Sequence, residues 1–267
     1  MNQIIGQCGL CKKQKALMES HLIPKSVYKI VVTKSSSNNP VLVKGGKSKK
    51  TSKQVKSHFL CSCCEKRLSK YGEDHVLKYT YRDTGRFIFQ NILEGIVHER
   101  EMDGALVFVG SKIPKIKINH FIHFALGVFW KASAGKWKFL GQQLVNNQLG
   151  KRYETQFREF LLGTSQFPEN AILTVSISNK KEPFPIAIFP IRYKHDGYFQ
   201  HRFYIPGIEF ILWVGNLIPN KNKDISISQP SGGAFFFEDL DKSPLLIKAK
   251  QYLKGKTNNF KMTSKSL

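Results

Sequence analysis

Hydrophobic residues along the chain follow two different periods, one before and one after about residue 170. Residues 119–133 and 151–162 place aromatic and aliphatic side chains three and four positions apart, which is the spacing of one helix face. Later apolar residues form short runs rich in Val, Ile, Phe and Tyr, separated by Pro, Gly and Asn. This change predicts helices over 83–165 and a mainly antiparallel sheet over 171–240.

The apolar runs of the second half are the expected strands. They lie at 171–178, 185–193, 201–205, 208–214 and 233–238. This half contains no phosphate-binding glycine loop and no Gly-x-Ser-x-Gly elbow, so it offers no chemistry of its own. We expect it to select substrate, to form a homodimer or to bind a partner protein.

The N-terminal third combines one helical stretch with a segment that has no apolar pattern. Residues 34–57 hold seven Lys, no acidic residue and many Ser, Asn and Gly. Because this composition cannot bury a core, we predict a mobile basic loop, which either follows a phosphate backbone or is a solvated insertion without a partner. A helix is expected from Cys61, since positions 64, 68, 71 and 75 recur at helical spacing.

Net charge narrows the class of partner. The 267 residues include 42 Lys and Arg against 19 Asp and Glu, a formal charge of +23. Residues 1–75 alone hold 15 basic and 4 acidic residues. This surplus attracts phosphates at long range and favours nucleic acid, with an anionic membrane surface as the weaker alternative. Of the two nucleic acids, we expect DNA more than RNA, a preference that the charge itself does not test.

Composition excludes two other classes. Apolar residues make up 41% of the chain, which is enough for a core and excludes a wholly disordered protein. No apolar run approaches the length of a membrane span, and residues 1–9 lack the regions of a secretion signal. We therefore expect a cytoplasmic protein.

All five cysteines lie within the first 64 residues. Four of them form two Cys-x-x-Cys steps, Cys8 with Cys11 and Cys61 with Cys64. In a reducing compartment such steps indicate thiolate ligands of zinc rather than disulfides, and two of them complete a tetrahedral site. Cys63 is either a spare thiol or a competitor for the register of the second pair.

A histidine motif follows the first cysteine pair. Residues 19–25 read Glu-Ser-His-Leu-Ile-Pro-Lys, and the second pair lies in Leu-Cys-Ser-Cys-Cys-Glu. This order resembles the HNH endonucleases, which have a zinc-bound ββα-metal, treble-clef core; the resemblance covers residues 8 to about 75. It implies that His21 is the general base that takes a proton from the attacking water, while Mg²⁺ or Mn²⁺ stabilises the leaving oxygen.

The acidic ligands differ from that family. Ser20 stands where the family has an acidic metal ligand, and Glu65 replaces the asparagine after the last cysteine. Glu65, as a catalytic residue, with Glu73 and His75, as ligands of the catalytic ion, could rebuild the metal site from the helix. A helix of solvated acidic residues is the alternative.

Together these patterns predict an α+β protein with three parts. Residues 1–82 form a zinc-bound, treble-clef module with its basic loop, 83–250 an α+β domain, and 251–267 a basic tail. The predicted function is a metal-dependent nuclease; the alternatives are a non-catalytic zinc-dependent nucleic-acid-binding module and a defence effector that a partner activates. The candidates for contacts to phosphate are Lys25, Lys29, Lys47, Lys49, Lys50, Lys53 and Arg67.

Overall fold

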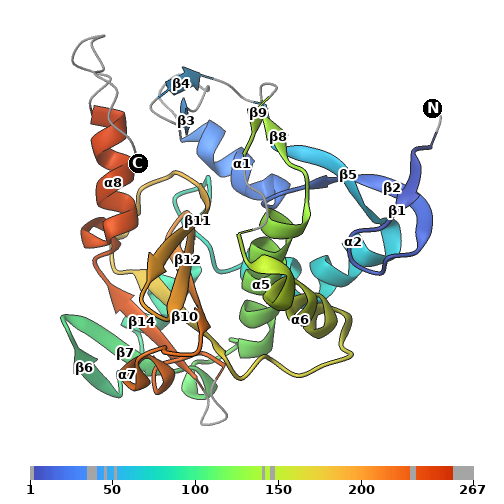
Figure 1. Cartoon of the computed structure of the whole chain (residues 1–267). Coiled ribbons are helices and arrows are strands. Elements are labelled where there is room, and N and C mark those ends of the chain that lie inside the picture. The colour runs from blue at the N-terminus through green and yellow to red at the C-terminus, as the bar shows by residue number, and fades with distance from the viewer. Residues whose placement is uncertain are drawn as a thin grey trace.

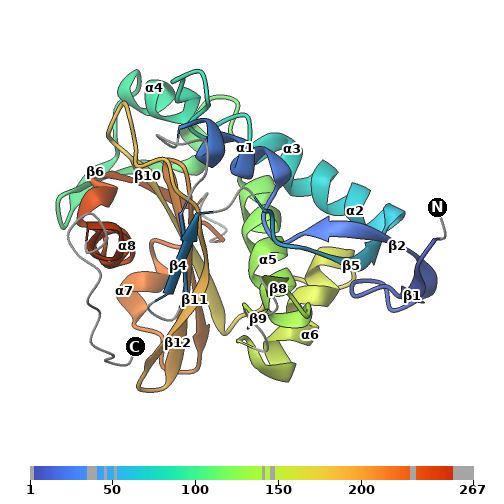
Figure 2. The same ribbon diagram turned by 90° about the horizontal axis from the view of Figure 1, so that it is seen from above.

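The computed structural model describes residues 3–34, 41–44, 47–50, 53–139, 142–144, 148–228 and 233–254. It contains a small sheet and a large sheet with helices between and around them (Figures 1 and 2). No helix in these ranges is both long and apolar enough to cross a lipid bilayer.

The small sheet and the helix after it form a ββα-like start. Its antiparallel strands have the order β1 (Ile5–Gln7), β2 (Gln14–His21), β5 (Lys56–Cys61). The helix α2 (Ser62–Leu68) follows β5 directly and continues through a π-helical turn (Ser69–Glu73) into α3 (Asp74–Val76). The helix expected from Cys61 is therefore present.

A long connection separates β2 from β5 in the chain. It holds α1 (Lys25–Thr33) and a hairpin of β3 (Val41–Lys44) and β4 (Lys47–Lys50), so the expected loop over 34–57 includes a hairpin and the start of β5. Residues 35–40, 45–46 and 51–52 lie outside the described part of the chain.

The large sheet has seven strands, and every neighbouring pair is antiparallel except β10 with β14. Strand β14 lies between β10 and β7, in the interior of the sheet. In spatial order the strands are β11 (Ile188–His195), β12 (Tyr198–Ile205), β13 (Ile208–Gly215), β10 (Ala171–Ser178), β14 (Ala234–Glu238), β7 (Ala105–Val109) and β6 (Arg100–Met102).

Residues 83–165 are not wholly helical, which corrects the expectation for this segment. They contain α4 (Ile88–Glu94) but also the hairpin β6–β7, whose two strands complete one edge of the large sheet. The turn is Asp103-Gly104, and both residues have positive φ, 51° and 81°. Asp-Gly between short strands is a signal for a tight hairpin turn, and it is visible in the sequence.

The remaining helices cover the two faces of the large sheet. Helix α5 (Ile118–Ala134) lies on one side and α8 (Pro244–Lys254) on the other (Figure 2). The other elements are α6 (Gly150–Leu162), the short strands β8 (Lys138–Phe139) and β9 (Gln142–Gln143), α7 (Asn220–Lys223), and 3-10 turns at Gly110–Lys112 and Leu240–Lys242.

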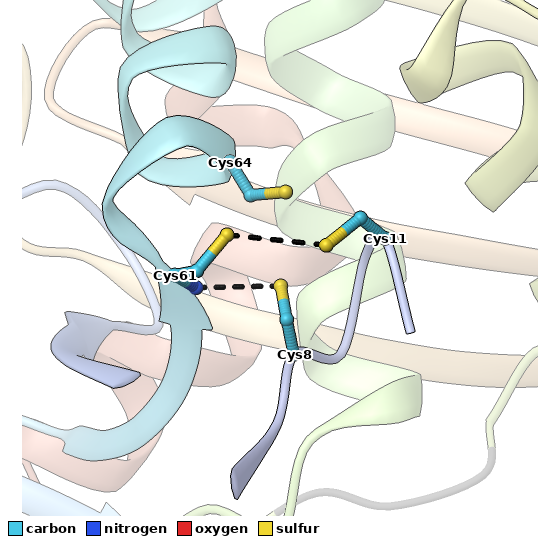
Figure 3. Close-up of side chains that lie close together, drawn as sticks. All are labelled: Cys8, Cys11, Cys61 and Cys64. Atoms are coloured by element: carbon cyan, nitrogen blue, oxygen red, sulfur yellow. Dashed lines mark hydrogen bonds between the residues drawn. The ribbon is translucent and has the colours of Figure 1, made fainter. Parts of the chain in front are cut away.

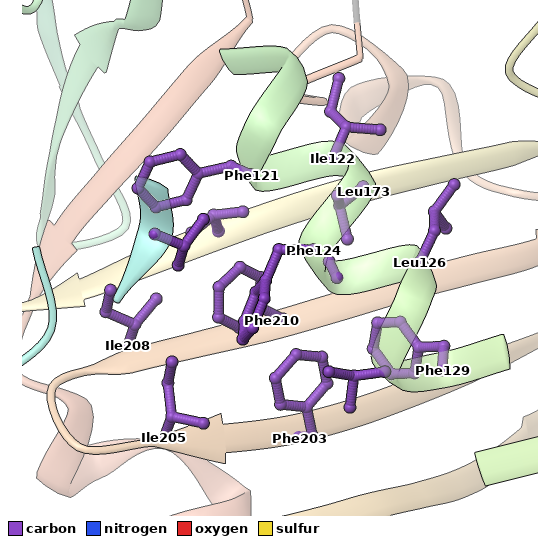
Figure 4. Packing of buried hydrophobic residues seen from close by; sticks show 14 of the residues in the cluster. Phe121, Ile122, Phe124, Leu126, Phe129, Leu173, Phe203, Ile205, Ile208 and Phe210 are labelled. Carbon is purple, nitrogen blue, oxygen red and sulfur yellow. The ribbon is translucent and has the colours of Figure 1, made fainter. Parts of the chain in front are cut away.

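Helix α5 lies at the centre of the core, which explains its run of apolar residues. Phe124 packs on Phe210 with ring centroids 5.4 Å apart, and Phe129 packs on Phe203 at 4.9 Å (Figure 4). The opposite side of α5 meets the π-helical turn at Gly72, where an added Cβ would lie 2.9 Å from backbone atoms of Phe124. One hydrophobic cluster therefore runs from the ββα-like unit through α5 to the large sheet.

Candidate functional site

The four cysteines of the two Cys-x-x-Cys steps meet between the β1–β2 loop and the start of α2. Their Sγ atoms all lie within 4.8 Å of one another, and Figure 3 shows the four side chains converging. Cys8, Cys61 and Cys64 are buried and Cys11 is half-buried. Residues about fifty positions apart in the chain thus form one cluster of four sulfur ligands.

Local backbone structure shapes the first step into a tight turn. The amide of Lys12 donates to the carbonyl of Cys8, and the amide of Cys8 donates to the carbonyl of Lys13, both at 2.9 Å. Lys12 has a φ of 61°, in the left-handed region. A Cβ on Gly9 would lie 2.3 Å from the Phe59 ring, so only glycine allows the turn to approach β5 this closely.

The cluster fits a zinc ion. Zinc–sulfur bonds of about 2.3 Å in a tetrahedron separate the sulfur atoms by roughly 3.8 Å, and the Sγ atoms of Cys11 and Cys61 are 3.9 Å apart. The backbone amide of Cys61 donates to the Sγ of Cys8 at 3.3 Å, an interaction that stabilises a thiolate. Burial and the neighbouring sulfur atoms raise the pKa of Cys64, so a cation is needed to hold these groups as thiolates. When bound, zinc would join the β1–β2 loop to α2.

Cys63 is not part of this cluster. Its side chain is exposed on α2, whereas the adjacent Cys64 is buried among the sulfur ligands. The structure therefore favours Cys61 with Cys64 as the second pair and leaves Cys63 as the spare thiol.

His21 is the last residue of β2, next to β5. Its Nε2 atom lies 2.7 Å from Oε1 of Gln54, a residue just before β5. An amide oxygen only accepts hydrogen bonds, so this contact requires a proton on Nε2 of His21. Gln54 thus holds the ring in place and leaves Nδ1 as the ring nitrogen outside this contact.

The main chain of His21 is held from a distant helix. The ammonium group of Lys131, on α5, donates to the His21 carbonyl at 3.0 Å and forms an ion pair with Glu73 at 3.3 Å. The Lys131 side chain is 3% exposed. This buried lysine therefore ties the end of β2 to α5 and to the helical segment after α2.

Ser20 and Glu19, which precede the histidine, both have local partners. The Ser20 hydroxyl is buried and accepts the amide of Leu60 at 3.1 Å, so it joins β2 to β5. Glu19 pairs with Lys56 at 2.7 Å, and this hydrogen bond and charge lower the pKa of the Glu19 carboxyl. Ser20, in the position of the family's acidic ligand, has a structural contact here.

Glu65, Glu73 and His75, the residues predicted to act with a catalytic ion, are not gathered into one group. Among the described residues, the cysteines are the only set of three or more close metal-ligating side chains. Glu73 is paired with Lys131, while His75 is buried and its Nε2 accepts the amide of Lys117 at 3.0 Å. Burial lowers the pKa of His75 to about 4. Oε1 of Glu65 is buried and has no hydrogen-bond partner among the described residues. These three side chains do not fit a Mg²⁺ or Mn²⁺ site as they stand.

The candidate phosphate-binding residues have varied surroundings. Lys25 and Lys53 are exposed, and Lys29 forms an exposed ion pair with Asp83 at 3.1 Å. Arg67 is half-buried, and its guanidinium lies 5.4 Å from the centroid of the Tyr71 ring. The side chains of Lys47, Lys49 and Lys50 lie outside the described part of the structure.

The sequence does not predict two residues that contact His21, namely Gln54 and Lys131. Gln54 lies in a polar segment with no motif, and its contact with His21 joins positions 33 apart. Lys131 follows a tryptophan in an apolar helix and resembles a surface lysine beside a buried ring. The one available signal is that residues on every side of that helix are apolar, which predicts a helix buried all round and hence a buried lysine.

Comparisons of the chain with protein families, with curated proteins and with solved structures found no significant match.

Proposed function

We propose that this protein is a nuclease that hydrolyses phosphodiester bonds of nucleic acid, with His21 as general base. The observation that carries the proposal is the contact of His21 Nε2 with Gln54 Oε1, at the end of a strand in a ββα-like unit with a four-cysteine cluster. This arrangement supports the resemblance of residues 8 to about 75 to the HNH core. Zinc, held by the cysteines, has the structural role of fixing that unit.

The chemistry assigned to His21 is one proton transfer. Nδ1 takes a proton from water as the water oxygen bonds to phosphorus, and the bond from phosphorus to the leaving oxygen breaks. The leaving oxygen departs with the electron pair of that bond and takes a proton from solvent. Oε1 of Gln54 accepts the hydrogen bond from Nε2–H throughout, which stabilises the imidazolium that forms. Since Glu65, Glu73 and His75 do not form an ion site, we derive no step through a divalent ion.

Positive groups next to His21 favour a phosphate ligand. Helix α1 begins at Lys25, four residues after His21, and its first turn contains no acidic residue. Unpaired amides at a helix N-terminus attract phosphate oxygens, and the exposed Lys25 adds a charge there. With the net charge of +23, these groups support a polyanionic substrate, with DNA preferred.

The ion pair of Glu73 with Lys131 favours a second function. A carboxylate already neutralised by a buried lysine is not free to hold a catalytic cation. The same unit without its chemistry is a zinc-dependent nucleic-acid-binding module, or an effector that a partner protein completes through the β-rich half.

The experiment that separates these functions is a cleavage assay on the full-length protein. Wild type and His21→Ala are incubated with supercoiled plasmid, linear duplex DNA and single-stranded RNA, each with Mg²⁺, Mn²⁺ or chelator. If His21 is the general base, the wild-type protein cuts the nucleic acid, and His21→Ala cuts it at least about a hundredfold more slowly. His98→Ala, which removes a half-buried histidine paired with Glu101, is the matched control and keeps full activity.

Zinc content is measured for each variant, so that lost activity is not confused with a lost fold. If wild type cuts no substrate under any condition, while both proteins shift the mobility of DNA equally, the nuclease proposal is wrong and the binding module is the better description.

A further inference from the structure

In the described part of the chain, one face of the large sheet is only partly covered at the end where β11 and β12 form a hairpin. On β12, the buried Tyr204 packs with Leu245 and Leu246 of α8, so it lies on the face that α8 covers, and the buried Arg202 shares this face because side chains alternate along a strand. The next two residues on the same face, Gln200 and Tyr198, are half-buried. Burial of side chains decreases along the neighbouring β13 as well: Glu209 is buried, whereas Trp213, nearer the hairpin end, is half-buried. Among the residues that the structure describes, the layer that covers this face therefore ends partway along these strands.

Aromatic side chains occupy the uncovered part of this face. Cross-strand pairing places His195 opposite Tyr198 and Gln200 opposite Trp213. The rings of His195 and Tyr198 stack with centroids 4.6 Å apart and planes at 12°, and the Trp213 ring lies 5.6 Å from Tyr198. We call these three residues the aromatic platform.

The exposed part of the platform is ring surface bordered by a cation. Nε1 of Trp213 is buried, so the surface that Trp213 exposes does not include its polar atom. Lys248, on α8, has its ammonium 5.9 Å from the centroid of the Tyr193 ring. Tyr193 is paired with Gln200, so it lies on the same face and next to the platform.

We propose that the aromatic platform binds single-stranded nucleic acid by stacking of its bases. Rings on neighbouring strands of an open sheet face accept the π-faces of successive bases, and flanking cations contact the backbone. Lys248 and a chain with net charge +23 are complementary to a phosphodiester strand, whereas Gln200 supplies a polar group to base edges. The proposal shares its ligand class with the proposed nuclease, but it rests on different residues, more than 170 positions from His21 in the sequence.

Tryptophan fluorescence reports on this site selectively. The protein has three tryptophans, and Trp130 and Trp137 are fully buried, which leaves Trp213 as the accessible one. The full-length His21→Ala protein, which prevents cutting by the proposed base, is titrated with single-stranded oligo(dT) of 12 nucleotides and with a duplex of the same length. We expect saturable quenching by the single strand and little quenching by the duplex, whose bases are already stacked.

Variants then locate the binding. Tyr198→Ala should weaken oligo(dT) affinity by roughly tenfold, since each base stacked on an aromatic ring contributes in this range. Trp213→Phe retains a ring, so it should abolish the quenching but keep affinity within about threefold when binding is followed by anisotropy of labelled oligo(dT). Val97→Ala, which truncates a side chain that is 91% exposed just before β6, at the opposite edge of the sheet, is the control and should bind as the parent protein does.

The proposal is wrong if oligo(dT) does not quench Trp213 while acrylamide does, or if Tyr198→Ala binds oligo(dT) as tightly as the parent protein. Either result would show that nucleic-acid bases do not stack on this face. Because binding is measured without cleavage, its outcome is independent of whether His21 catalyses hydrolysis.

Discussion

His201 and His123 are buried histidines whose surroundings disfavour a charge. His201 is 1% exposed and packs near Phe129, and burial lowers its pKa to about 3. Burial likewise lowers the pKa of His123, on α5, to about 4. In the unfolded chain both titrate near 6.5, so below that pH the unfolded state binds more protons. Their contribution to stability is complete above about pH 6.5 and is lost as the pH falls toward their folded pKa values.

We therefore predict that the free energy of unfolding falls between pH 7 and pH 4.5. Substituting leucine for His201 removes one of these protonation sites and should reduce the fall by about 2 kcal/mol. Urea denaturation at the two pH values measures this difference. His98→Leu, at a half-buried position, should leave the pH dependence unchanged, and an equal effect of both variants would contradict the assignment to His201.

Lys131 is another buried side chain, and its polar contacts should contribute to the free energy of unfolding. Replacing it with methionine removes the ion pair with Glu73 and the hydrogen bond to the His21 carbonyl. Because the half-buried carboxylate of Glu73 and the His21 carbonyl are left without their partner, we expect a loss of about 2–4 kcal/mol in urea denaturation. The exposed Lys136→Met, a few residues further along the chain, should change stability by less than about 0.5 kcal/mol.

A double-mutant cycle with Glu73→Gln tests whether the pair itself is responsible. If the two substitutions are simply additive, Lys131 stabilises the protein by packing and by its hydrogen bond to the His21 carbonyl, and not through the pair with Glu73.

At the scale of elements, the cysteine cluster joins a loop to a helix that are distant in the sequence. We predict one zinc ion per chain, bound by Cys8, Cys11, Cys61 and Cys64. Cys8→Ser should abolish zinc in the purified protein and lower the melting temperature by at least about 10 °C, since metal binding contributes directly to folding. Metal analysis and thermal denaturation measure both effects. The exposed Cys63→Ser should retain both the zinc and the melting temperature, and loss of zinc in that variant would mean a different ligand set.

Two glycines lie where α5 meets the helical segment after Cys61, and substitution by alanine should have opposite effects at the two positions. An alanine at Gly72 would place its Cβ 2.9 Å from the Phe124 backbone, so we expect Gly72→Ala to destabilise the protein by about 1–3 kcal/mol. An alanine at Gly127, within α5, would meet only a Leu68 side-chain carbon, at 3.7 Å. Gly127→Ala should stabilise the protein by up to about 1 kcal/mol, because alanine favours the helix.

Chemical denaturation of the two glycine variants and wild type decides the sign of each effect. Destabilisation of similar size in both variants would mean that the helices are packed closely at Gly127 too.

At the scale of the whole molecule, the predicted boundary at residue 82 crosses a continuous core. The largest hydrophobic cluster includes Cys8 and Leu60 from the N-terminal unit and Phe210 and Phe237 from the large sheet. We therefore expect one calorimetric unfolding transition for the zinc-loaded protein. Two separated transitions, one of them sensitive to chelator, would instead show that residues 1–82 unfold independently.

The sequence predicts a feature well when the residues that make contact in it are close together in the chain, and poorly when they are far apart. The cysteine pairs and the two helices of the middle region repeat at short spacing, so local patterns locate them. The contact of Lys131 with His21 joins positions 110 apart, and no local pattern contains it. The hairpin β6–β7 was missed for another reason: its strands are three and five residues long, shorter than the runs that periodicity detects.

The position of β14 also affects how the chain folds during synthesis. Strand β7 leaves the ribosome more than 120 residues before β14, and β10 more than 50 residues before it, yet β14 lies between them. At about 5–20 residues per second, the inner edges of β7 and β10 wait for several seconds with unpaired backbone groups. During translation, therefore, the two parts of the sheet exist for a time without the strand that joins them. At this stage the unpaired edges of β7 and β10 are open to a chaperone or to mispairing with a neighbouring chain.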